Sequence, residues 1–431
     1  MSRLDELIAE LCPNGVEYKS LGEIATIARG GNFQKKDFCD RGVPCIHYGQ
    51  IYTKYGLFTD KTITFITEEG AKKQKFAKTN DIIMAVTSEN IEDVCKCLAW
   101  LGNEDVAVSG HSAIISHNQN PKYLVYYFHS QMFFIQKRKL AHGTKVIEVT
   151  PDTLKSIKLP VPPLEVQREI VHILDSFTLL TAELTAELTA RKKQYEFYRD
   201  KLLTFSENKV KYLPLGELYP DIRNGFVGTV TPFFSNKENG VLYLRGTNVH
   251  DGVISNEDVV YVSKEFHEKH NRTELKSDDI IMVQSGHVGE CAVVGEAYAG
   301  ANCHALIVMS NGGKCNSKYI VYYFHSYEGR KKLDAITTGG TVKHILASKM
   351  KKVIVPIPPL EVQNRLVNVL DNLEAICTDL NIGLPAEIEV RQKQYEYYRD
   401  LLLTFAETGS TLMTDRQTDR QTDRQTDRQT D

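Results

Sequence analysis

A stretch of about forty residues without glycine or proline, residues 164–205, constrains the fold of this chain more than any other segment. Pro162 and Pro163 stand just before it, where proline favours the start of a helix. Side chains spaced alternately by three and four residues form one seam, as in a helix packed along its length against another helix. At about 1.5 Å per residue, this helix would be roughly 60 Å long, so we expect a strut or spacer. The seam is formed by Ile170, Leu174, Phe177, Thr181, Leu184, Leu188, Arg191, Tyr195, Tyr198, Leu202 and Phe205.

Several segments of the chain occur twice, about 200 residues apart. Residues 16–23 match 210–217, 81–84 match 279–282, 123–130 match 319–326, 162–167 match 358–363, and 193–200 match 393–400. The chain is therefore a duplicated unit of one globular head and one long helix, and not a solenoid of short repeats. Between these segments only scattered positions match, which favours two heads with one task but different targets over simple drift after duplication.

The second long helix, which begins near Leu360, is an imperfect copy of the first. Matching positions lie 196 residues apart at its start (358 against 162) and 200 apart at its end (393 against 193), so it contains four additional residues. Gly383, Leu384 and Pro385 combine a helix stop with a restart, so we expect a kink or short break there. Two long helices with apolar seams would pair most simply in antiparallel fashion and hold the heads apart.

Within each head, short β-rich runs alternate with turns rich in glycine and asparagine, and a helical run follows. Head 1 (residues 1–158) has β-rich runs at 62–66, 81–86 and 113–116, a helical run at 121–140 and a closing strand at 156–161. Head 2 (residues 209–353) has β-rich runs at 241–245, 259–262, 280–283 and 305–309, a helical run at 318–336 and a closing strand at 352–357. The pattern predicts an α+β fold: two globular domains separated by two long antiparallel helices in a coiled coil.

Composition limits the class of protein. A net charge of −3 does not by itself indicate a nucleic-acid binder, but local patches make phosphate contacts, not the total charge. Nine cysteines without a secretory leader indicate reduced thiols, and no apolar run approaches the ~20 residues that span a bilayer. We therefore expect a soluble, cytoplasmic protein with no membrane partner.

Motifs of catalysis are missing from the sequence. It has no P-loop, no glycine-rich dinucleotide turn, no nucleophile elbow and no Asn-Pro-Pro-aromatic motif of amino-methylating enzymes. Cys95 and Cys97 lack the spacing and the second pair of a zinc site, and His267 and His270 lack partners nearby in the sequence. We expect a binding protein with no catalytic residues and no metal site.

Loops at matching places in the two heads carry side chains suited to DNA. Arg and Lys can read guanine, Asn and Gln can read adenine, Ser and Thr can hold phosphates, and glycines allow close approach to a groove. Most loops of this composition are solvated turns, but their recurrence in both heads favours DNA contact. The candidates in head 1 are Arg29, Asn32, Gln34, Lys35, Lys36, Tyr48, Gln50, Thr144 and Lys145. Those in head 2 are Arg223, Asn224, Arg245, Thr247, Asn248, Gln284, Ser285, His287, Thr341 and Lys343.

The helix motifs resemble a known family. Each long helix begins with P-x-P-P-L-E-x-Q, and residues 191–205 and 391–405 both follow R-x-K-Q-Y-x-[YF]-Y-R-D-x-L-L-x-F. With the duplicated plan, these motifs resemble the specificity (S) subunit of Type I restriction–modification systems over residues 15–407. The resemblance implies two target-recognition domains, each binding half of a split DNA site, and helices that dock two methyltransferase (M) subunits, with restriction (R) subunits joining them. It also implies a non-catalytic chain, with S-adenosylmethionine, ATP and Mg belonging to the partner subunits.

On this resemblance the chain divides into five parts. Residues 1–158 form target-recognition domain 1, 159–208 the central helical spacer, 209–353 target-recognition domain 2, 354–407 the C-terminal helix and 408–431 a tail. Thr-Ala-Glu-Leu occurs in tandem at 181–188, like the family's length-variable spacer, so the helix is expected to set the distance between half-sites. The residues expected on the spacer and partner-docking helices are Leu174, Phe177, Leu184, Leu188, Tyr195, Tyr198, Leu202, Tyr395 and Tyr398.

The tail repeats Thr-Asp-Arg-Gln from residue 414 onward and is too polar to bury a core, so we expect disorder. The codons ACA GAC AGA CAG would encode this repeat as a perfect ACAG tract, in which slippage shifts the reading frame downstream. We therefore expect phase variation, which the coding DNA can test.

Two other interpretations stay open. A self-contained DNA-modifying enzyme with unrecognised motifs would methylate DNA without partners. A coiled-coil adaptor between proteins would fail to bind DNA even with M subunits present.

Overall fold

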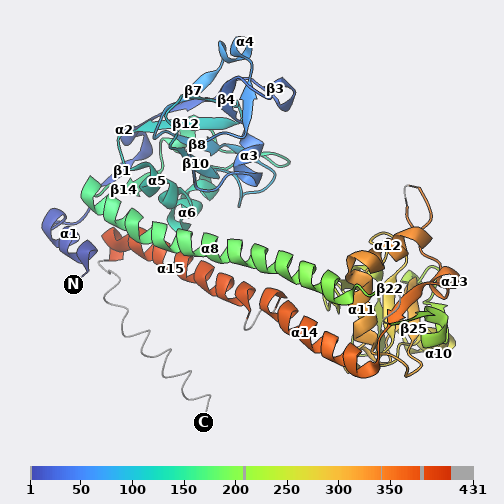
Figure 1. Ribbon diagram of the computed structural model, residues 1–431. Coiled ribbons are helices and arrows are strands. Elements are labelled where there is room, and N and C mark those ends of the chain that lie inside the picture. The colour runs from blue at the N-terminus through green and yellow to red at the C-terminus, as the bar shows by residue number, and fades with distance from the viewer. Residues whose placement is uncertain (1, 207–209, 341, 379–382, 409–431) are drawn as a thin grey trace. The chain divides into compact units, whose positions relative to one another are not determined.

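The computed structural model of the chain describes residues 2–206, 210–340, 342–378 and 383–408. It divides into two compact units, each described here by itself. Unit 1 comprises Met1–Leu184 and Ile388–Asp431, and unit 2 comprises Thr185–Glu387. Head 1 belongs to unit 1 and head 2 to unit 2 (Figure 1).

Unit 1 contains two five-stranded sheets, with strand orders β2-β12-β8-β10-β5 and β3-β6-β4-β11-β7. Short pairs β1-β14 and β13-β9 complete it. The elements of head 1 are α1 (Arg3–Leu11), β1 (Tyr18–Ser20), α2 (Leu21–Ile24), β2 (Ala25–Arg29), η1 (Lys35–Asp37), β3 (Phe38–Cys39), β4 (Val43–Ile46), α3 (Tyr48–Thr53), β5 (Phe58–Thr59), β6 (Thr64–Ile66), α4 (Glu68–Ala71), β7 (Lys75–Ala77), β8 (Ile82–Ala85), β9 (Thr87–Ser88), β10 (Cys97–Trp100), β11 (Val106–Val108), β12 (Ser112–His117), α5 (Pro121–Phe128), α6 (Gln131–Leu140), β13 (Ile147–Glu148), α7 (Pro151–Leu154) and β14 (Lys158–Pro160).

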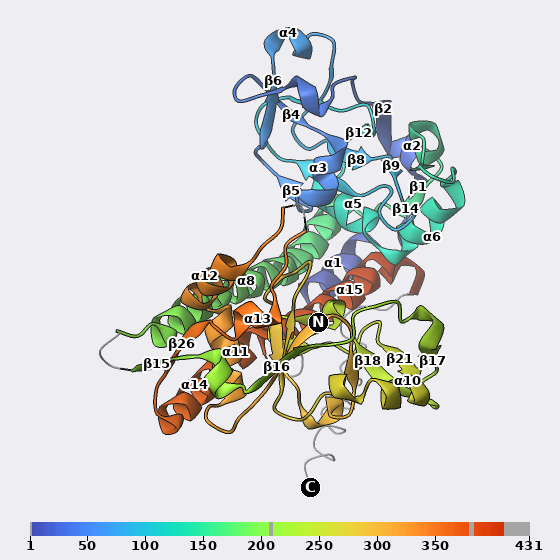
Figure 2. The ribbon, with the colours of Figure 1, turned by 90° about the vertical axis from the view of Figure 1, so that its right-hand side faces the viewer.

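Unit 2 contains two four-stranded sheets, with strand orders β16-β25-β22-β23 and β17-β21-β18-β24, and the pairs β15-β26 and β19-β20. Figure 2 gives the clearer view of the second of these sheets. The elements of head 2 and its closing strand are β15 (Lys211–Pro214), α9 (Leu215–Leu218), β16 (Asp221–Asn224), η2 (Thr231–Phe233), β17 (Phe234–Ser235), β18 (Gly240–Leu244), η3 (Gly246–Asn248), β19 (Val249–His250), β20 (Val253–Ile254), β21 (Val260–Ser263), α10 (Lys264–Lys269), η4 (Asn271–Thr273), β22 (Ile280–Val283), β23 (Cys291–Val293), η5 (Glu296–Tyr298), β24 (Asn302–Cys303), β25 (Leu306–Ser310), α11 (Ser317–His325), α12 (Tyr327–Ile336), α13 (Ala347–Met350) and β26 (Ile354–Ile357).

The two heads share the order of four strands in each main sheet, and head 1 adds β5 and β7 at the edges, which confirms the predicted α+β class and internal duplication. The order β2-β12-β8-β10 corresponds to β16-β25-β22-β23, and β3-β6-β4-β11 corresponds to β17-β21-β18-β24. Even the single parallel pairing inside the second sheet recurs, between β4 and β11 and between β18 and β24. The frame therefore survived the divergence of the sequence between the repeated segments.

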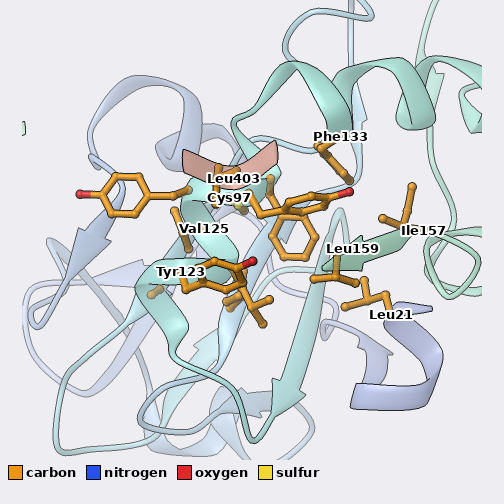
Figure 3. Packing of buried hydrophobic residues seen from close by; sticks show 14 of the residues in the cluster. Leu21, Cys97, Tyr123, Val125, Phe133, Ile157, Leu159 and Leu403 are labelled. Atoms are coloured by element: carbon orange, nitrogen blue, oxygen red, sulfur yellow. The ribbon is translucent and has the colours of Figure 1, made fainter. Parts of the chain in front are cut away.

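A tyrosine-rich helix forms the centre of each core. In unit 1, Tyr123 and Tyr127 of α5 are buried, and their hydroxyls donate to the Pro160 and Lys158 carbonyls of β14 at 3.0 and 2.6 Å. Figure 3 shows Tyr123 among Val125, Leu159 and other apolar side chains. In unit 2, Tyr319 of α11 donates to the Pro356 carbonyl of β26 at 2.9 Å. Tyr123, Tyr127 and Tyr319 thus each place the hydroxyl on the closing strand while the ring fills the core.

The helical run predicted in each head is two helices, not one. Between α5 and α6, Ser130 adopts an extended backbone and its Oγ accepts from the Phe133 amide at 3.3 Å. Ser326 caps α12 in the same way, accepting from Gly329 at 3.3 Å. Serine at this position favours the start of a new helix because its side chain satisfies an otherwise free amide.

The long helices confirm the prediction of one continuous and one interrupted helix. The first, α8 (Leu164–Leu203), spans 40 residues. The second is divided into α14 (Leu360–Thr378) and α15 (Leu384–Thr408), so Pro385 takes the second position of the new helix. Inside unit 1, the first half of α8 and α15 run side by side in opposite directions (Figure 1). There Phe177 stacks on Tyr398 with ring centroids 5.3 Å apart.

The repeated ending of the long helices has the same task in each unit. In unit 1, Asp400 of α15 accepts from the Gln131 amide at the start of α6, at 3.2 Å. In unit 2, Asp200 of α8 accepts from the Tyr327 amide at the start of α12, at 3.1 Å. A carboxylate near free amides at a helix N-terminus is favourable. The aspartate of the repeated motif therefore fastens each helix end to the second helix of a head.

The seam of α8 is less continuous than the spacing predicts. Leu174 is buried, and Leu184, Leu188 and Leu202 are half-buried. Tyr195 is also half-buried, and its hydroxyl donates to Glu374 of α14 inside unit 2 at 3.2 Å. By contrast Arg191 and Tyr198 are exposed. The strict heptad seam is therefore wrong at these two positions. None of the helices in the described ranges is long and apolar enough to cross a membrane.

Candidate nucleic-acid interface

The loops that carry the first candidate residues begin at equivalent positions in the two heads, at the end of β2 and at the end of β16. The Gly30 amide donates to the Ser112 carbonyl at 2.9 Å, and the Gly225 amide to the Leu306 carbonyl at 2.7 Å. In head 1 the next residue, Gly31, forms a β-bridge with Ser109 in the turn between β11 and β12. In head 2 the next residue, Phe226, forms the same bridge with His304 in the turn between β24 and β25. Arg29 and Asn224 thus occupy one structural position, and Ser109 and His304 another.

The glycines in these loops are needed for approach to the protein's own backbone. A Cβ atom on Gly30 would lie 2.2 Å from the Ser109 carbonyl oxygen, and one on Gly225 would lie 2.7 Å from the Cys303 carbonyl oxygen. Both distances are far inside van der Waals contact, and a backbone carbonyl cannot move aside cheaply. The expectation that these glycines serve approach to a DNA groove is therefore replaced by a role in packing the loop against the turn.

Five of the head 1 candidates come together around one groove. Its volume is about 900 Å³, and the turn between β11 and β12 supplies residues that the sequence analysis missed, including Ser109 and His111. A polar Ser-Gly-His turn between two apolar strands was the available signal. The candidates that line the groove are Arg29, Asn32, Gln34, Lys36 and Tyr48.

Aromatic rings form one wall of this groove. Tyr48 lies between His47 and His111, with ring centroids 4.6 and 4.9 Å away. Burial, and next the charge of Lys35, lower the pKa of His47, so its ring is neutral at pH 7. His47 Nδ1 accepts from the Gly49 amide at 3.2 Å, which leaves Nε2–H as the donor of the ring. The groove therefore offers flat rings, a guanidinium and an amide, the groups that contact base edges and phosphates.

Two of the candidates have the same internal task. Gln50 is buried and its Oε1 accepts from the His47 amide at 2.9 Å. Asn248 is buried and its Oδ1 accepts from the Arg245 amide at 3.0 Å. Their amide nitrogens are used as well, by Thr64 Oγ1 for Gln50 and by the Glu257 carbonyl for Asn248. Both side chains cap the short helix after β4 or β18, and neither projects a free polar group to solvent.

Gln50→Ala is expected to destabilise the protein by about 1–3 kcal/mol because the buried His47 amide loses its acceptor. Asn32→Ala, in the neighbouring exposed loop, is the matched control and should change stability by less than about 0.5 kcal/mol. Urea unfolding of the full chain, followed by tyrosine and tryptophan fluorescence, measures both. Equal stability of the two variants would contradict the capping role.

The candidate arginines differ in the exposure of their side chains and in their hydrogen-bond partners. Arg223 has only 9% of its side chain exposed. Its guanidinium donates to the Arg272 and Glu274 carbonyls, each at 2.9 Å, so it supports the fold of head 2. Arg29 is half-exposed but pairs with Glu148 at 2.8 Å. Arg245, at the position equivalent to His47, donates to the Asp258 carbonyl. Arg29 lines the groove of head 1.

A second loop, after α6 or α12, has the same geometry in both heads. Gly143 and Gly339 have φ values of 108° and 109°, which an L side chain rarely adopts. In head 1 the segment after this loop pairs with the segment that follows β8, so Glu148 lies opposite Thr87. In head 2 it pairs with the segment that follows β22, so His344 lies opposite Ser285. Ser285 Oγ and His344 Nδ1 are 2.6 Å apart. Thr144 and Lys145 in head 1 and Lys343 in head 2 are exposed in these loops.

The remaining candidates of both heads divide by exposure. Gln284 and Ser285 are half-buried, and Thr341 lies outside the described residues. Those with exposed side chains are Lys35, Asn224, Thr247 and His287. Within the described ranges, no group of three or more His, Cys, Asp or Glu residues is arranged to hold a metal ion.

A duplicated α+β frame that presents different polar side chains on matching loops defines a two-headed recognition protein. Comparison with known proteins gives the family. The sequence matches the Type I restriction modification DNA specificity domain over residues 13–191 and again over residues 226–390. The chain belongs to this family. It is a specificity subunit, a non-catalytic component of a Type I restriction–modification system that recognises DNA sequence.

Individual relatives agree with this assignment. The chain is 34% identical over 323 residues to a putative type I restriction enzyme specificity subunit of Haemophilus influenzae, covering 71% of this chain and 77% of the relative. It is 35% identical over 269 residues to the EcoR124I/EcoR124II specificity subunit of Escherichia coli, covering 58% of this chain and 63% of that protein. A solved structure from work on complex assembly and conformational transition of the type I R-M system has the same fold, with a TM-score of 0.64 and 18% identity over 91% of this chain and 98% of that one.

Proposed function

We propose that each head reads one half of a bipartite DNA target and that the long helices set the distance between the halves. One observation carries the proposal: a single frame presents different side chains at equivalent positions. Arg29 corresponds to Asn224, His47 to Arg245 and Ser109 to His304. A constant frame with variable polar loops suits two readings of different sequences by one mode of docking.

Docking of the partner subunits is part of this proposal. The long helices expose large apolar side chains, among them Phe197 at 60%, Leu179 at 61% and Val390 at 53%. Exposed apolar surface of this kind marks protein interfaces. Two methyltransferase subunits would dock on these helices, and restriction subunits would join them. S-adenosylmethionine, ATP and Mg would be bound by those subunits and not by this chain.

Single-molecule methylome sequencing tests the bipartite function. The chain and its methyltransferase partner are expressed in a host that lacks other Type I systems. We expect one asymmetric motif made of two short blocks of specified bases around an unspecified spacer. The variants Asn32→Ala and Thr247→Ala, which alter one exposed loop residue of each head, should each relax or abolish only one block, and a different one. A continuous motif, or loss of both blocks in either variant, would overturn the proposal.

A further inference from the structure

A second groove in head 1, beside the first, is lined by four lysines, of which the sequence analysis singled out only Lys36. It has a volume of about 980 Å³ and lies between the loop after β2 and the segment that links α4 to β7. We name it the lysine groove and define it by Lys36, Lys72, Lys73 and Lys75, which all line it. Two carboxylates, of Asp37 and Glu69, share the lining, so positive charge prevails.

The four ammonium groups of the lysine groove are free. Their side chains are exposed, and in the part of the chain that the structure describes no salt bridge or side-chain hydrogen bond engages them. The Asp37 carboxylate is already used, since its Oδ2 accepts from the Gln34 amide at 2.7 Å. Four lysines against two carboxylates leave a net positive lining, and among the described residues no carboxylate forms an ion pair with any of these lysines, so the groove favours a polyanion as its occupant.

The lysine groove adjoins the groove that holds the base-contact candidates. Asn32, Phe33, Lys36 and Asp37 line both. The segments are also tightly packed, because a Cβ atom on Gly31 would lie 2.9 Å from Gln74 Cα and 3.0 Å from the Lys75 amide nitrogen. Lys75 is the β7 partner of Val108, one residue before Ser109. A duplex with base edges at the first groove would therefore bring its phosphates to the lysines of the second.

Head 2 does not repeat the lysines of the helical turn η1. The helical turns η1 and η2 are equivalent, since the Asp37 amide donates to the Gln34 carbonyl and the Phe233 amide to the Val230 carbonyl, both at 2.9 Å. Thr231 and Pro232 therefore take the places of Lys35 and Lys36. Phe233 and Phe234 next to them are 44% and 42% exposed, so head 2 is apolar at this turn, where head 1 has Lys35 and Lys36.

We infer that the lysine groove is a phosphate-binding site that grips the DNA backbone on the side of head 1, independently of base sequence. The inference rests on the proposed DNA-reading function and adds a site to it. Lysine–phosphate contacts position a protein on the duplex and carry no sequence information by themselves. Their signature is the release of condensed counterions, which makes affinity depend on salt.

The test compares two charge-matched variants of the full chain, each purified with its methyltransferase partner. The first variant is Lys72→Gln, Lys73→Gln and Lys75→Gln. The control is Arg138→Gln, Lys139→Gln and Lys158→Gln, three exposed cations on α6 and β14. Figures 1 and 2 both place α6 and α4 at opposite ends of the globular part of unit 1. Fluorescence anisotropy over roughly 50–200 mM KCl gives the affinity for the methylated target duplex and for a scrambled duplex.

The expected result is a selective change in the salt dependence. Each phosphate contact contributes about 0.9 to the slope of log affinity against log salt, so the groove variant should lose about two to three from that slope. The loss should be the same on both duplexes and should leave the methylated motif unchanged, while the control keeps the wild-type slope. A wild-type slope in the groove variant, or reduced copurification of the methyltransferase, would overturn the phosphate site while leaving the bipartite function standing. Absence of DNA binding by the wild-type complex would overturn both.

Discussion

Deletion of residues 185–188 is expected to bring the two half-sites about one base pair closer and to leave the bases of both unchanged. The four residues account for about 6 Å of helix and a rotation of ~400°, or ~40° beyond a full turn. One base pair advances the duplex by about 3.4 Å and turns it by close to 35°. The rotation therefore matches one base pair better than two.

The structure favours a clean effect of this deletion. Residues 181–188 lie within the unbroken helix α8, and Thr185, Ala186 and Glu187 are exposed. Leu184 and Leu188 are half-buried, so removing one tetrapeptide leaves a leucine in nearly the same orientation. Residual rotation of ~40° falls within the width of an apolar stripe. Neither head loses a core residue.

Methylome sequencing of the deletion variant measures the spacer directly. The double substitution Thr185→Ala and Glu187→Ala is the matched control, because it alters the same turn without changing its length. It should retain the original motif, while the deletion variant should lose methylation at the original sites and gain it at sites one base pair shorter. Altered bases within either half-site, or an unchanged spacer, would contradict the role of the helix as a spacer.

The long helices, the duplication and several strands could be predicted from the sequence because local signals specify them. The double proline, the absence of glycine over residues 164–205 and the restart at Leu384 determine the helix ends to within a few residues. Recurrence of the tyrosine helix and the closing strand revealed the duplication. Short β-rich runs between turns located the strands β8, β12, β22 and β25. Each of these signals lies within a short window of sequence.

The candidate site was less accessible because it depends on contacts between distant segments. Asn32 and Gln50 both look suited to reading adenine, yet Asn32 is exposed at the groove and Gln50 is buried as a cap. Arg29 and Arg223 likewise both look suited to reading guanine, yet the Arg29 side chain is half-exposed and the Arg223 side chain is almost fully buried. Tertiary structure decides which polar group stays free, and a single sequence does not report it.

The sequence analysis did not predict that the end of each long helix packs into the core of a head. Leu402, Leu403 and Phe405 of α15 are buried in the core of unit 1, with Tyr123 and Leu174. Leu203 of α8 is buried in the core of unit 2, with Tyr319 and Leu370. The matching endings of the two long helices were the signal, because they have matching roles in the two units. Each ending completes a core, so the last turns of α15 are structural for head 1.

Combined substitution of Leu402, Leu403 and Phe405 by alanine is therefore expected to unfold unit 1 while unit 2 stays folded. Each buried leucine contributes about 2–5 kcal/mol and phenylalanine about 3–5 kcal/mol relative to alanine. Their sum approaches or exceeds the ~5–15 kcal/mol stability of a typical domain. Substitution also weakens the cap that Asp400 forms on α6, because α15 loses its anchorage.

Hydrogen–deuterium exchange of the full-length variant distinguishes the two units. Protection should be lost in α5 and β8 of unit 1 and kept in α11 and β22 of unit 2. Val390→Ala on the same helix is the control, since Val390 is 53% exposed and should leave both units protected. Leu203→Ala provides the reciprocal test, because it should weaken unit 2 by about 2–5 kcal/mol and spare unit 1. Loss of protection in unit 2 of the triple variant, or full protection in unit 1, would show that α15 does not complete the core of head 1.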